Sequence, residues 1–427
     1  MRVELQFFLT LICIYITINV VFLHKMFICF GEGLEMKENQ FKINEISLAI
    51  LLFWCGLIVV ASNYITIPLM SAFTQQFHVS AEQTAWLGTS FSFAYALSCL
   101  LVGVLSDRFG RKRIMVGGLI LLSVITLIIP FGNQLSWLIM GRIMQGIAAS
   151  SFAPVAVVYI SEKFSKEIKG TVVGLVSASF LISAIVGQIM SAYISRLLNW
   201  QAVFCTFGII YLLTALILYS YASPVSNQSK GILFSQLFRH YWEILRKKNL
   251  IKLYLIALTL LFAFVAFYTV LEGYSVHTFH LSKDNIFKIR ALGVIGMLFA
   301  SFADKLARKF DIKCLLILSL LFSLVSLFII AFCPYLNVLI IMSLLFVAGI
   351  SIIVPTLIIL VGRFGQNQAG IAVSFYTFIL FLGASFGPIA GVQLLTVLGA
   401  KATFLTLALL LLFSMLVAFT LDIKGEQ

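Results

Sequence analysis

A tight cluster of charge interrupts an otherwise apolar part of the chain. Residues 103–113 read GVLSDRFGRKR, and the segments on both sides carry almost no charge. Asp107 stands at the end of the apolar run that precedes the cluster. Its carboxylate has three alternatives: to cap the N-terminus of a neighbouring helix, to pair with Arg111, or to pair with an arginine from another helix. A loop that only fixed the orientation of the chain would need the bases, but neither the acid nor Gly103 and Gly110.

One arginine stands alone inside an apolar run. The run is LIMGRIMQGIAAS (138–150), and an arginine near the centre of a membrane span costs about 2.5–3.5 kcal/mol on insertion scales. No Asp or Glu lies inside the apolar runs of the first half of the chain. Arg142 therefore needs another partner, such as Gln145 or backbone carbonyls. Two interpretations stay open: Arg142 has a function inside the membrane, or it is structural.

One carboxylate of the second half lies near an apolar run and away from the charge clusters. Glu272, in YTVLEGYSVH (268–277), is the second candidate for proton coupling, provided that Gly273 breaks the helix and turns the carboxylate inward. The alternative is an ordinary acid of an outer loop. His277 and His280 are expected in solvated loops.

Composition defines the class of protein that carries these charges. Of the 427 residues, 61% are hydrophobic and 11% charged, and the mean hydropathy is +1.09. Soluble domains carry about 25% charged residues, so this chain has too few polar side chains to cover a surface that faces water. The period-two alternation of a transmembrane barrel is missing. We therefore predict an all-α membrane protein.

Several other chemistries lack their motifs. The sequence has no GxxxxGK[ST] loop for a nucleotide, no HExxH, and no Ser–His pair or paired acids at membrane depth. We expect no enzyme activity and no cofactor. The seven cysteines occur singly, without CxxC pairs or a histidine at metal-ligand spacing, which indicates neither a metal site nor a disulfide framework.

The apolar runs predict twelve transmembrane helices, six on each side of the longest polar segment. They fall at about 46–69, 83–105, 114–131, 135–158, 170–195, 201–222, 250–271, 286–303, 313–332, 335–361, 368–396 and 402–421. This divides the chain into an N-terminal six-helix bundle (36–222), a cytoplasmic linker (223–249) and a C-terminal six-helix bundle (250–427). Within the linker, apolar residues at helical spacing in 232–248 predict an amphipathic helix at the membrane surface; a solvated linker helix is the alternative.

The first 35 residues do not fit the even count of spans. Residues 7–23 are apolar and form a thirteenth span, a signal-like segment or translated upstream sequence. We expect an N-terminal extension without a role in function.

Charge orients the predicted spans. Twenty-one Lys and Arg residues fall in the segments that lie on the side of Met36, and five fall on the other side: Arg196, Lys283, Lys288, Arg290 and Lys401. The positive-inside rule then puts both ends of the twelve-helix core in the cytoplasm of a multi-pass protein of the cell membrane. The net charge of +13 therefore marks orientation, and no nucleic-acid partner is expected.

The two halves repeat one another at an offset of about 200 residues. FHVSAEQ (77–83) matches FHLSKDN (279–285), and in both copies a serine is placed to cap the next helix, with Gln83 completing a capping box in the first. GVLSDRFGRK (103–112) matches ASFADKLARK (300–309), which aligns Asp107 with Asp304. Two related bundles would enclose a site at their interface near the membrane midplane, so the repeat predicts pseudo-symmetric bundles and transport.

GxxxDRxGRK resembles the signature of the major facilitator superfamily. In that family this loop is a conformational latch between the two halves, and closing it favours the outward-open state. The resemblance covers residues 40–421 and implies a latch made of Gly103, Asp107, Arg108, Gly110, Arg111, Lys112, Glu162, Asp304, Lys305 and Arg308.

RxxQG in the run around Arg142 resembles the twelve-helix drug–proton antiporters of the superfamily, in which the arginine is implicated in proton coupling. Their fifth span reads GxxxGPxxGG, whereas this chain has SAIVGQIMSA (183–192), with Gln188 in place of the proline. A closer copy, GASFGPIAG (383–391), lies in the eleventh predicted span. We expect helix packing at Gly146, Gly187, Gly383, Gly387, Pro388 and Gly391.

The most probable polar lining of a substrate cavity is Asn63, Tyr64, Gln145, Gln188 and Tyr376. Together with the resemblance, this predicts a secondary transporter that exports small amphipathic organic compounds in exchange for protons, by alternating access. The alternative is a proton-coupled importer of a sugar-like or organic-acid metabolite, with a membrane receptor a distant third. The expected partners are a small-molecule substrate, protons and the lipid bilayer, and the chain is expected to be a monomer.

Overall fold

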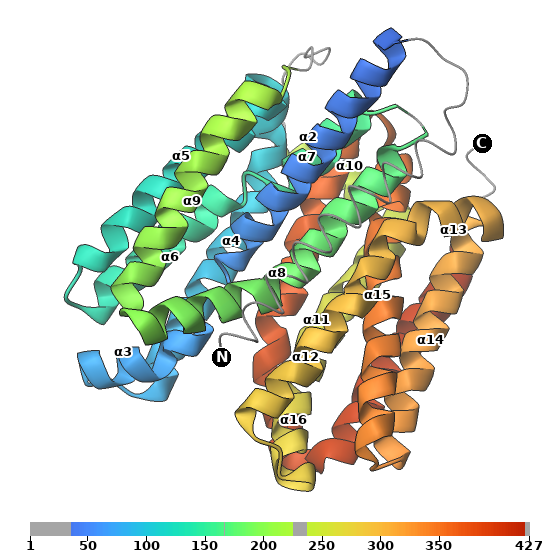
Figure 1. Ribbon diagram of the computed structural model, residues 1–427. Coiled ribbons are helices and arrows are strands. Elements are labelled where there is room, and N and C mark those ends of the chain that lie inside the picture. The colour runs from blue at the N-terminus through green and yellow to red at the C-terminus, as the bar shows by residue number, and fades with distance from the viewer. Residues whose placement is uncertain (1–35, 166, 225–236, 423–427) are drawn as a thin grey trace. The chain divides into compact units, whose positions relative to one another are not determined.

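The computed structural model describes residues 36–165, 167–224 and 237–422 (Figure 1). The N-terminal extension predicted at 1–35 and the first part of the amphipathic linker segment lie outside these residues. The chain divides into two compact units, Met1–Leu51 and Leu52–Gln427. The described part of the first unit is helical and begins the helix that ends in the second unit at Ala61. The second unit carries the candidate site.

Among the described residues every regular element is a helix. In chain order the elements are α2 (Met36–Ala61), η1 (Ile67–Leu69), α3 (Met70–Phe77), α4 (Ala81–Phe109), α5 (Arg111–Ile128), η2 (Ile129–Phe131), α6 (Leu135–Ala149), α7 (Ala153–Lys163), α8 (Lys169–Leu197), α9 (Trp200–Tyr221), α10 (Leu237–Arg246), α11 (Lys248–Phe279), α12 (Lys283–Met297), η4 (Leu298–Phe302), α13 (Ala303–Phe310), α14 (Ile312–Phe332), α15 (Leu336–Gly365), η5 (Gln366–Gln368) and α16 (Ala369–Phe419).

Within the described part of the chain, ten helical segments are long and apolar enough to cross a membrane. The two last predicted spans both lie in α16, on either side of Gly399, whose φ of 75° kinks the helix. The first predicted span is shorter than expected, because the helix ends at Ala61 and the backbone turns before Pro68. The all-helical membrane class predicted from composition is confirmed.

The serines that the sequence predicts as helix caps lie at the starts of α4 and α12. Ser80 accepts a hydrogen bond from the backbone N–H of Gln83, and the Gln83 side chain accepts one from the backbone N–H of Ser80, which confirms the predicted capping box. Ser282 caps α12 in the same way through the N–H of Asn285. These caps fix the first residue of α4 and of α12 at equivalent places in the two matching sequence segments.

Close packing inside each half depends on glycines. Figure 1 shows α5, α6 and α9 side by side in the first half, and α14 and α15 in the second. The α6 residue Gly146 lies against the backbone of α4, where a Cβ would meet the Phe91 carbonyl and would lie 3.0 Å from the Tyr95 nitrogen. Three glycines of α16 lie in the same way against α11, next to the carbonyls of Leu258, Phe262 and Ala266: Gly383, Gly387 and Gly391.

The two halves also contact one another through several helices. In the second unit α4 packs on α16, α7 packs on α16, and α8 packs on α15 and η4. Gly187 of α8 belongs instead to the packing within the first half, because a Cβ there would lie 2.9 Å from the Ala61 carbonyl. Pro388 lies inside α16, which continues as a helix through it.

We predict that Gly146→Val destabilises the protein, because the new side chain would collide with the α4 backbone, which cannot move aside as a side chain can. Overpacking of this kind costs about 1–3 kcal/mol. The measurement is the midpoint of thermal unfolding in detergent, which should fall by several degrees.

Gly117→Val is the matched control, since Gly117 is an exposed residue of α5 and a Cβ there would meet nothing within 4 Å. Equal midpoints for the two variants would show that α4 and α6 do not need the glycine.

Candidate functional site

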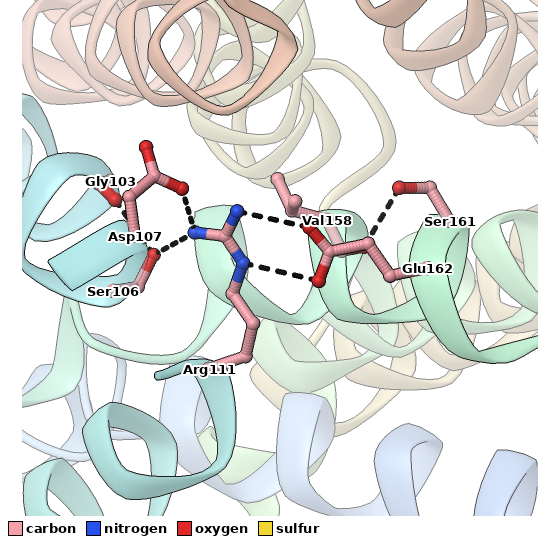
Figure 2. A network of polar contacts seen from close by, with 7 residues as sticks. All are labelled: Gly103, Ser106, Asp107, Arg111, Val158, Ser161 and Glu162. Carbon is pink, nitrogen blue, oxygen red and sulfur yellow. Dashed lines mark hydrogen bonds and ion pairs between the residues drawn. The ribbon is translucent and has the colours of Figure 1, made fainter. Parts of the chain in front are cut away.

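A charged network closes the end of the second unit at which α4 turns into α5. Arg111 forms an ion pair with Asp107, and its Nη2 lies 3.1 Å from Oε1 of Glu162 (Figure 2). Its Nη1 also donates to Oγ of Ser106 at 2.6 Å. Gly110 adopts a φ of 94°, which lets α5 begin directly after α4 and turns Arg111 back toward the end of α4. We call this end of the unit the latch end.

Asp107 also faces the second half of the chain. A Cβ on Gly370 would lie 3.4 Å from Oδ1 of Asp107, and one on Gly103 would collide with Ser374. Because Gly370 is the second residue of α16, the carboxylate lies at the positive end of that helix. The charged cluster thus joins α4, α5, α7 and α16.

The second copy of the motif makes the mirror-like contact. The carboxylate of Asp304 lies against Gly170, the second residue of α8. Arg308 lies 2.8 Å from Oδ2 of Asp304 and donates to the Glu167 carbonyl at 2.6 Å. Each aspartate therefore stands at the N-terminus of a helix from the other half.

The other basic residues predicted for the latch lie around this core. Lys112 lies over the ring of Tyr219 at 4.7 Å, and Arg108 over that of Phe109 at 5.4 Å. Lys305 lies on the exposed side of α13. These three side chains border the network of Asp107, Arg111 and Glu162.

Helix α10 adds the linker to the latch end. The hydroxyl of Tyr241 donates to the Leu100 carbonyl of α4, and its ring lies 5.6 Å from that of Phe375 on α16. The Gln368 amide donates to Glu243 at 3.0 Å, and this hydrogen bond lowers the pKa of the Glu243 carboxyl. The linker helix thus contacts both halves.

Arg142 is completely buried on α6 and is held by uncharged groups. Its Nε donates to the Leu87 carbonyl at 3.0 Å, Nη1 to the Gln145 side chain at 2.8 Å, and Nη2 to the Asn63 carbonyl at 3.4 Å. The guanidinium lies 4.3 Å from the centre of the Phe91 ring. No ion pair of Arg142 occurs among the described residues, so its charge is solvated by the protein but not neutralised.

The five predicted lining residues divide into two sets. Asn63 and Gln145 both accept hydrogen bonds from Arg142. The side chain of Asn63 also accepts a hydrogen bond from Ser92 at 2.7 Å, and Tyr64 follows Asn63 in the turn after α2. Gln188 donates to the Ala184 carbonyl of its own helix at 2.7 Å. Tyr376 is buried and donates to the Val354 carbonyl at 3.4 Å. The structure therefore does not bring Gln188 and Tyr376 to Arg142.

One aromatic residue beside Arg142 escaped the sequence reasoning. Tyr95 is fully buried. The centre of its ring lies 6.1 Å from that of Phe91 and 4.3 Å from that of Phe381, which belongs to the other half. Its hydroxyl is buried without a hydrogen-bond partner among the described residues. Nothing in the sequence separates Tyr95 from the thirteen other tyrosines, because only the packing of α4 against α16 selects it.

Glu272 does not turn inward as the sequence interpretation required. Helix α11 continues past Gly273 to Phe279, and Glu272 is half exposed and ion-paired with Arg290 at 2.7 Å. Arg290 lies near the start of the candidate span Asn285–Phe310 and of the predicted span 286–303, although the charge count assigned it to the outer segments.

No group of metal ligands is present among the described residues. The described cysteines, Cys55, Cys99, Cys205, Cys314 and Cys333, are free thiols. The chemistry available at the site is thus that of charge, hydrogen bonding and aromatic packing.

The sequence of most of the second unit matches one family model. The model describes the Major Facilitator Superfamily and matches residues 52–379, which include the charged network and Arg142. The chain belongs to the major facilitator superfamily.

Curated relatives within the superfamily include named drug transporters. Multidrug resistance protein 2 of Bacillus subtilis is 24% identical over 335 residues, 76% of this chain and 83% of the relative. The multi-drug resistance efflux pump PmrA of Streptococcus pneumoniae is 24% identical over 370 residues, 83% of this chain and 91% of the relative. An uncharacterized transporter of Buchnera aphidicola is 25% identical over 68% of this chain and 70% of the relative.

Solved structures of superfamily transporters share the fold. The human organic anion transporter MFSD10 (TETRAN) has a TM-score of 0.72 at 16% identity and covers 87% of this chain and 98% of its own. The transporter FucP in the outward conformation has a TM-score of 0.71 at 16% identity and covers 89% of this chain and 99% of its own. This superfamily member is therefore a multi-pass membrane transporter.

We predict that Asp107→Asn abolishes most transport by this superfamily member while leaving expression intact. The substitution removes the charge that joins Arg111 to the N-terminus of α16 but keeps the size of the side chain. Asp304→Asn should be milder, because Arg308, the arginine that pairs with Asp304, is half exposed, whereas Arg111 is buried. Flux in proteoliposomes measures the transport activity of both variants. Equal activities would indicate that the charged network only sets the orientation of the chain in the membrane.

Proposed function

We propose that the chain is a twelve-helix, proton-coupled efflux transporter for small amphipathic organic compounds, working by alternating access. The latch end faces the cytoplasm, the protein resides in the plasma membrane, and a single chain is the working unit. The network of Asp107, Arg111 and Glu162 is the latch, with Asp304 and Arg308 as its second copy.

The observation that carries this proposal is that charged contacts join the two halves at the latch end. Asp107 faces the start of α16, and Arg308 donates from α13 to the Glu167 carbonyl, so each half contributes one aspartate and one arginine. A carrier that binds its substrate from one side at a time needs such a closure at one end while the other end exchanges substrate. Contacts of this kind favour a state that is closed toward the cytoplasm.

The substrate class is inferred from the surroundings of Arg142. Phe91, Tyr95 and Phe381 supply aromatic surface from both halves near one buried positive charge. Such surfaces suit compounds with an apolar body and one polar group. The two relatives named for multidrug resistance support the same class.

A second candidate function is proton-coupled import of a sugar-like or organic-acid metabolite. It is favoured by one observation, the departure of α8 from the antiporter pattern. Ser183 and Ser191 replace glycines there, and Gln188 replaces the proline. The sign of the coupling to protons separates the two functions.

The test uses proteoliposomes that contain only this chain, loaded with an acidic lumen or placed in an acidic medium. In antiport, protons leaving an acidic lumen drive a dye such as ethidium inward. In symport, an acidic medium drives uptake. Accumulation with an acidic lumen is the expected result; accumulation with an acidic medium alone would favour import, and no accumulation of any dye would contradict both.

We predict that the latch end faces the cytoplasm, because the loops there collect the Lys and Arg residues. Reporter fusions should place the segments around Arg111, Lys247 and Arg308 inside, and those around Glu82 and Asp284 outside. A reporter at Lys247 that is accessible from outside the cell would reverse the proposed direction.

We predict that Arg142→Ala loses accumulation driven by a pH gradient. The buried charge repels other cations and protons from its surroundings, and it responds to water or to a substrate anion that enters. Arg142→Lys should recover only part of the activity, because an ammonium cannot make the three directed hydrogen bonds of the planar guanidinium.

The control is transport down a concentration gradient without a pH gradient, which Arg142→Ala should retain in part. Uphill transport by Arg142→Ala at the wild-type rate would make the arginine structural and move the proton pathway elsewhere.

A further inference from the structure

A second arginine lies at the end of the second unit opposite to the latch end. Arg290 of α12 is 19% exposed, and its Nη2 contacts Oε2 of Glu272 at 2.7 Å and the Tyr268 carbonyl at 2.9 Å, both on α11. The guanidinium centre lies 5.9 Å from the centre of the Tyr268 ring. The Arg290–Tyr268 pair thus joins α11 and α12 through one nitrogen of the guanidinium, and the remaining N–H groups are left for other partners.

Two donors of this pair are buried and have no acceptor. The Nε of Arg290 and the hydroxyl of Tyr268 are both buried without a hydrogen-bond partner in the described part of the chain. Unpaired buried donors are costly, and an arginine Nε can only donate. What the pair lacks is therefore an acceptor oxygen, and an anionic one forms the stronger bonds with a guanidinium.

A glycine brings the free hydroxyl close to α12. A Cβ on Gly293, one turn after Arg290 on α12, would collide with Oη of Tyr268, while the next residue it would meet is Val347 at 4.0 Å. The hydroxyl therefore lies against the α12 backbone at Gly293, and any side chain at this position would displace it. The glycine thus places the two free donors on neighbouring turns of one helix.

The charges near the pair favour a negative ligand. Glu272 is half exposed, so solvent screens much of its charge, whereas Arg290 is largely enclosed. In the sequence, the segments assigned to this side carry five basic residues against three acidic ones, Glu82, Glu272 and Asp284. An approaching anion thus meets a net positive surface and a partly neutralised arginine.

We propose that Arg290 and Tyr268 form a subsite for the carboxylate of an amphipathic organic acid, with Glu272 as a built-in carboxylate that competes for the same guanidinium. The proposal rests on the proposed transport of small organic compounds and narrows its substrate class. The ligand oxygen accepts from Nε of Arg290 and from the Tyr268 hydroxyl, while its apolar body contacts the aromatic side chains beside Tyr268. Phe264 and Phe267 lie there, at ring distances of 5.1 and 5.6 Å.

The test measures binding of 4-fluorobenzoate to the full chain in nanodiscs of zwitterionic lipid at pH 7.5, by fluorine NMR, with 4-fluorobenzamide as the neutral isostere. We expect the benzoate to bind at least about tenfold more tightly than the amide. Arg290→Gln should weaken benzoate binding about tenfold, and Gly293→Val should weaken it similarly by displacing the Tyr268 hydroxyl. Glu272→Gln should tighten binding severalfold, because the competing carboxylate is gone.

Lys288→Gln is the matched control, since Lys288 is an exposed residue of the same helix and its loss removes the same charge. Equal weakening by Lys288→Gln and Arg290→Gln would contradict a defined subsite and indicate general attraction. Benzamide that binds as tightly as benzoate, or a Glu272→Gln protein that binds benzoate no better than wild type, would also overturn the proposal. The Glu272→Gln result keeps the test decisive if Arg290→Gln fails to fold.

The same preparation separates this proposal from the proposed function. If benzoate fails to bind while a pH gradient still drives ethidium into proteoliposomes, the carboxylate subsite is wrong and drug transport stands. If benzoate binds as expected and no dye is moved by either gradient, the subsite stands and multidrug efflux is wrong.

Discussion

The cost of placing charge inside a bundle of apolar helices governs this structure. An ion withdrawn from water loses several kcal/mol of solvation, which only well-placed partners restore. Asp107 recovers it from two positive groups at once, the guanidinium of Arg111 and the N-terminus of α16. Since one partner is in its own half and the other is in the opposite half, the aspartate is satisfied fully only when the two halves are together.

Arg142 meets the same constraint by another route. Its donors end on two backbone carbonyls and the Gln145 oxygen, and Gln145 in turn donates to Thr126 at 2.7 Å. Dipoles of this kind solvate a charge without cancelling it, so the site keeps its positive potential. The charge of Asp107 is thus compensated across the two halves, whereas that of Arg142 is solvated within the first half.

The sequence predicted the parts of this arrangement that depend on local spacing. The contact of Asp107 with Arg111 is one of the alternatives that the sequence offers, and the turn at Gly110 makes it possible by folding Arg111 back toward α4. The caps at Ser80 and Ser282 follow from the local sequence at each helix start. Contacts that depend on the rotation of one long helix against another could not be predicted from the sequence. Tyr95 against Phe381 and Arg290 against Glu272 are of this kind, because an apolar helix with few polar residues gives no amphipathic signal of which face meets a neighbour.

The closure at the latch end is built from many modest contacts. Tyr241, Lys247 and Arg308 each donate to a backbone carbonyl that is far away along the chain, those of Leu100, Phe364 and Glu167. A hydrogen bond of this kind contributes about 0.5–1.5 kcal/mol net, since water offers the same groups a partner when the contact opens. Their sum is a few kcal/mol, and a differential binding energy of about 5.5 kcal/mol is enough to invert a two-state population from 1:99 to 99:1. Contacts on this scale stabilise the latch end by a free energy that the binding of one small molecule can offset.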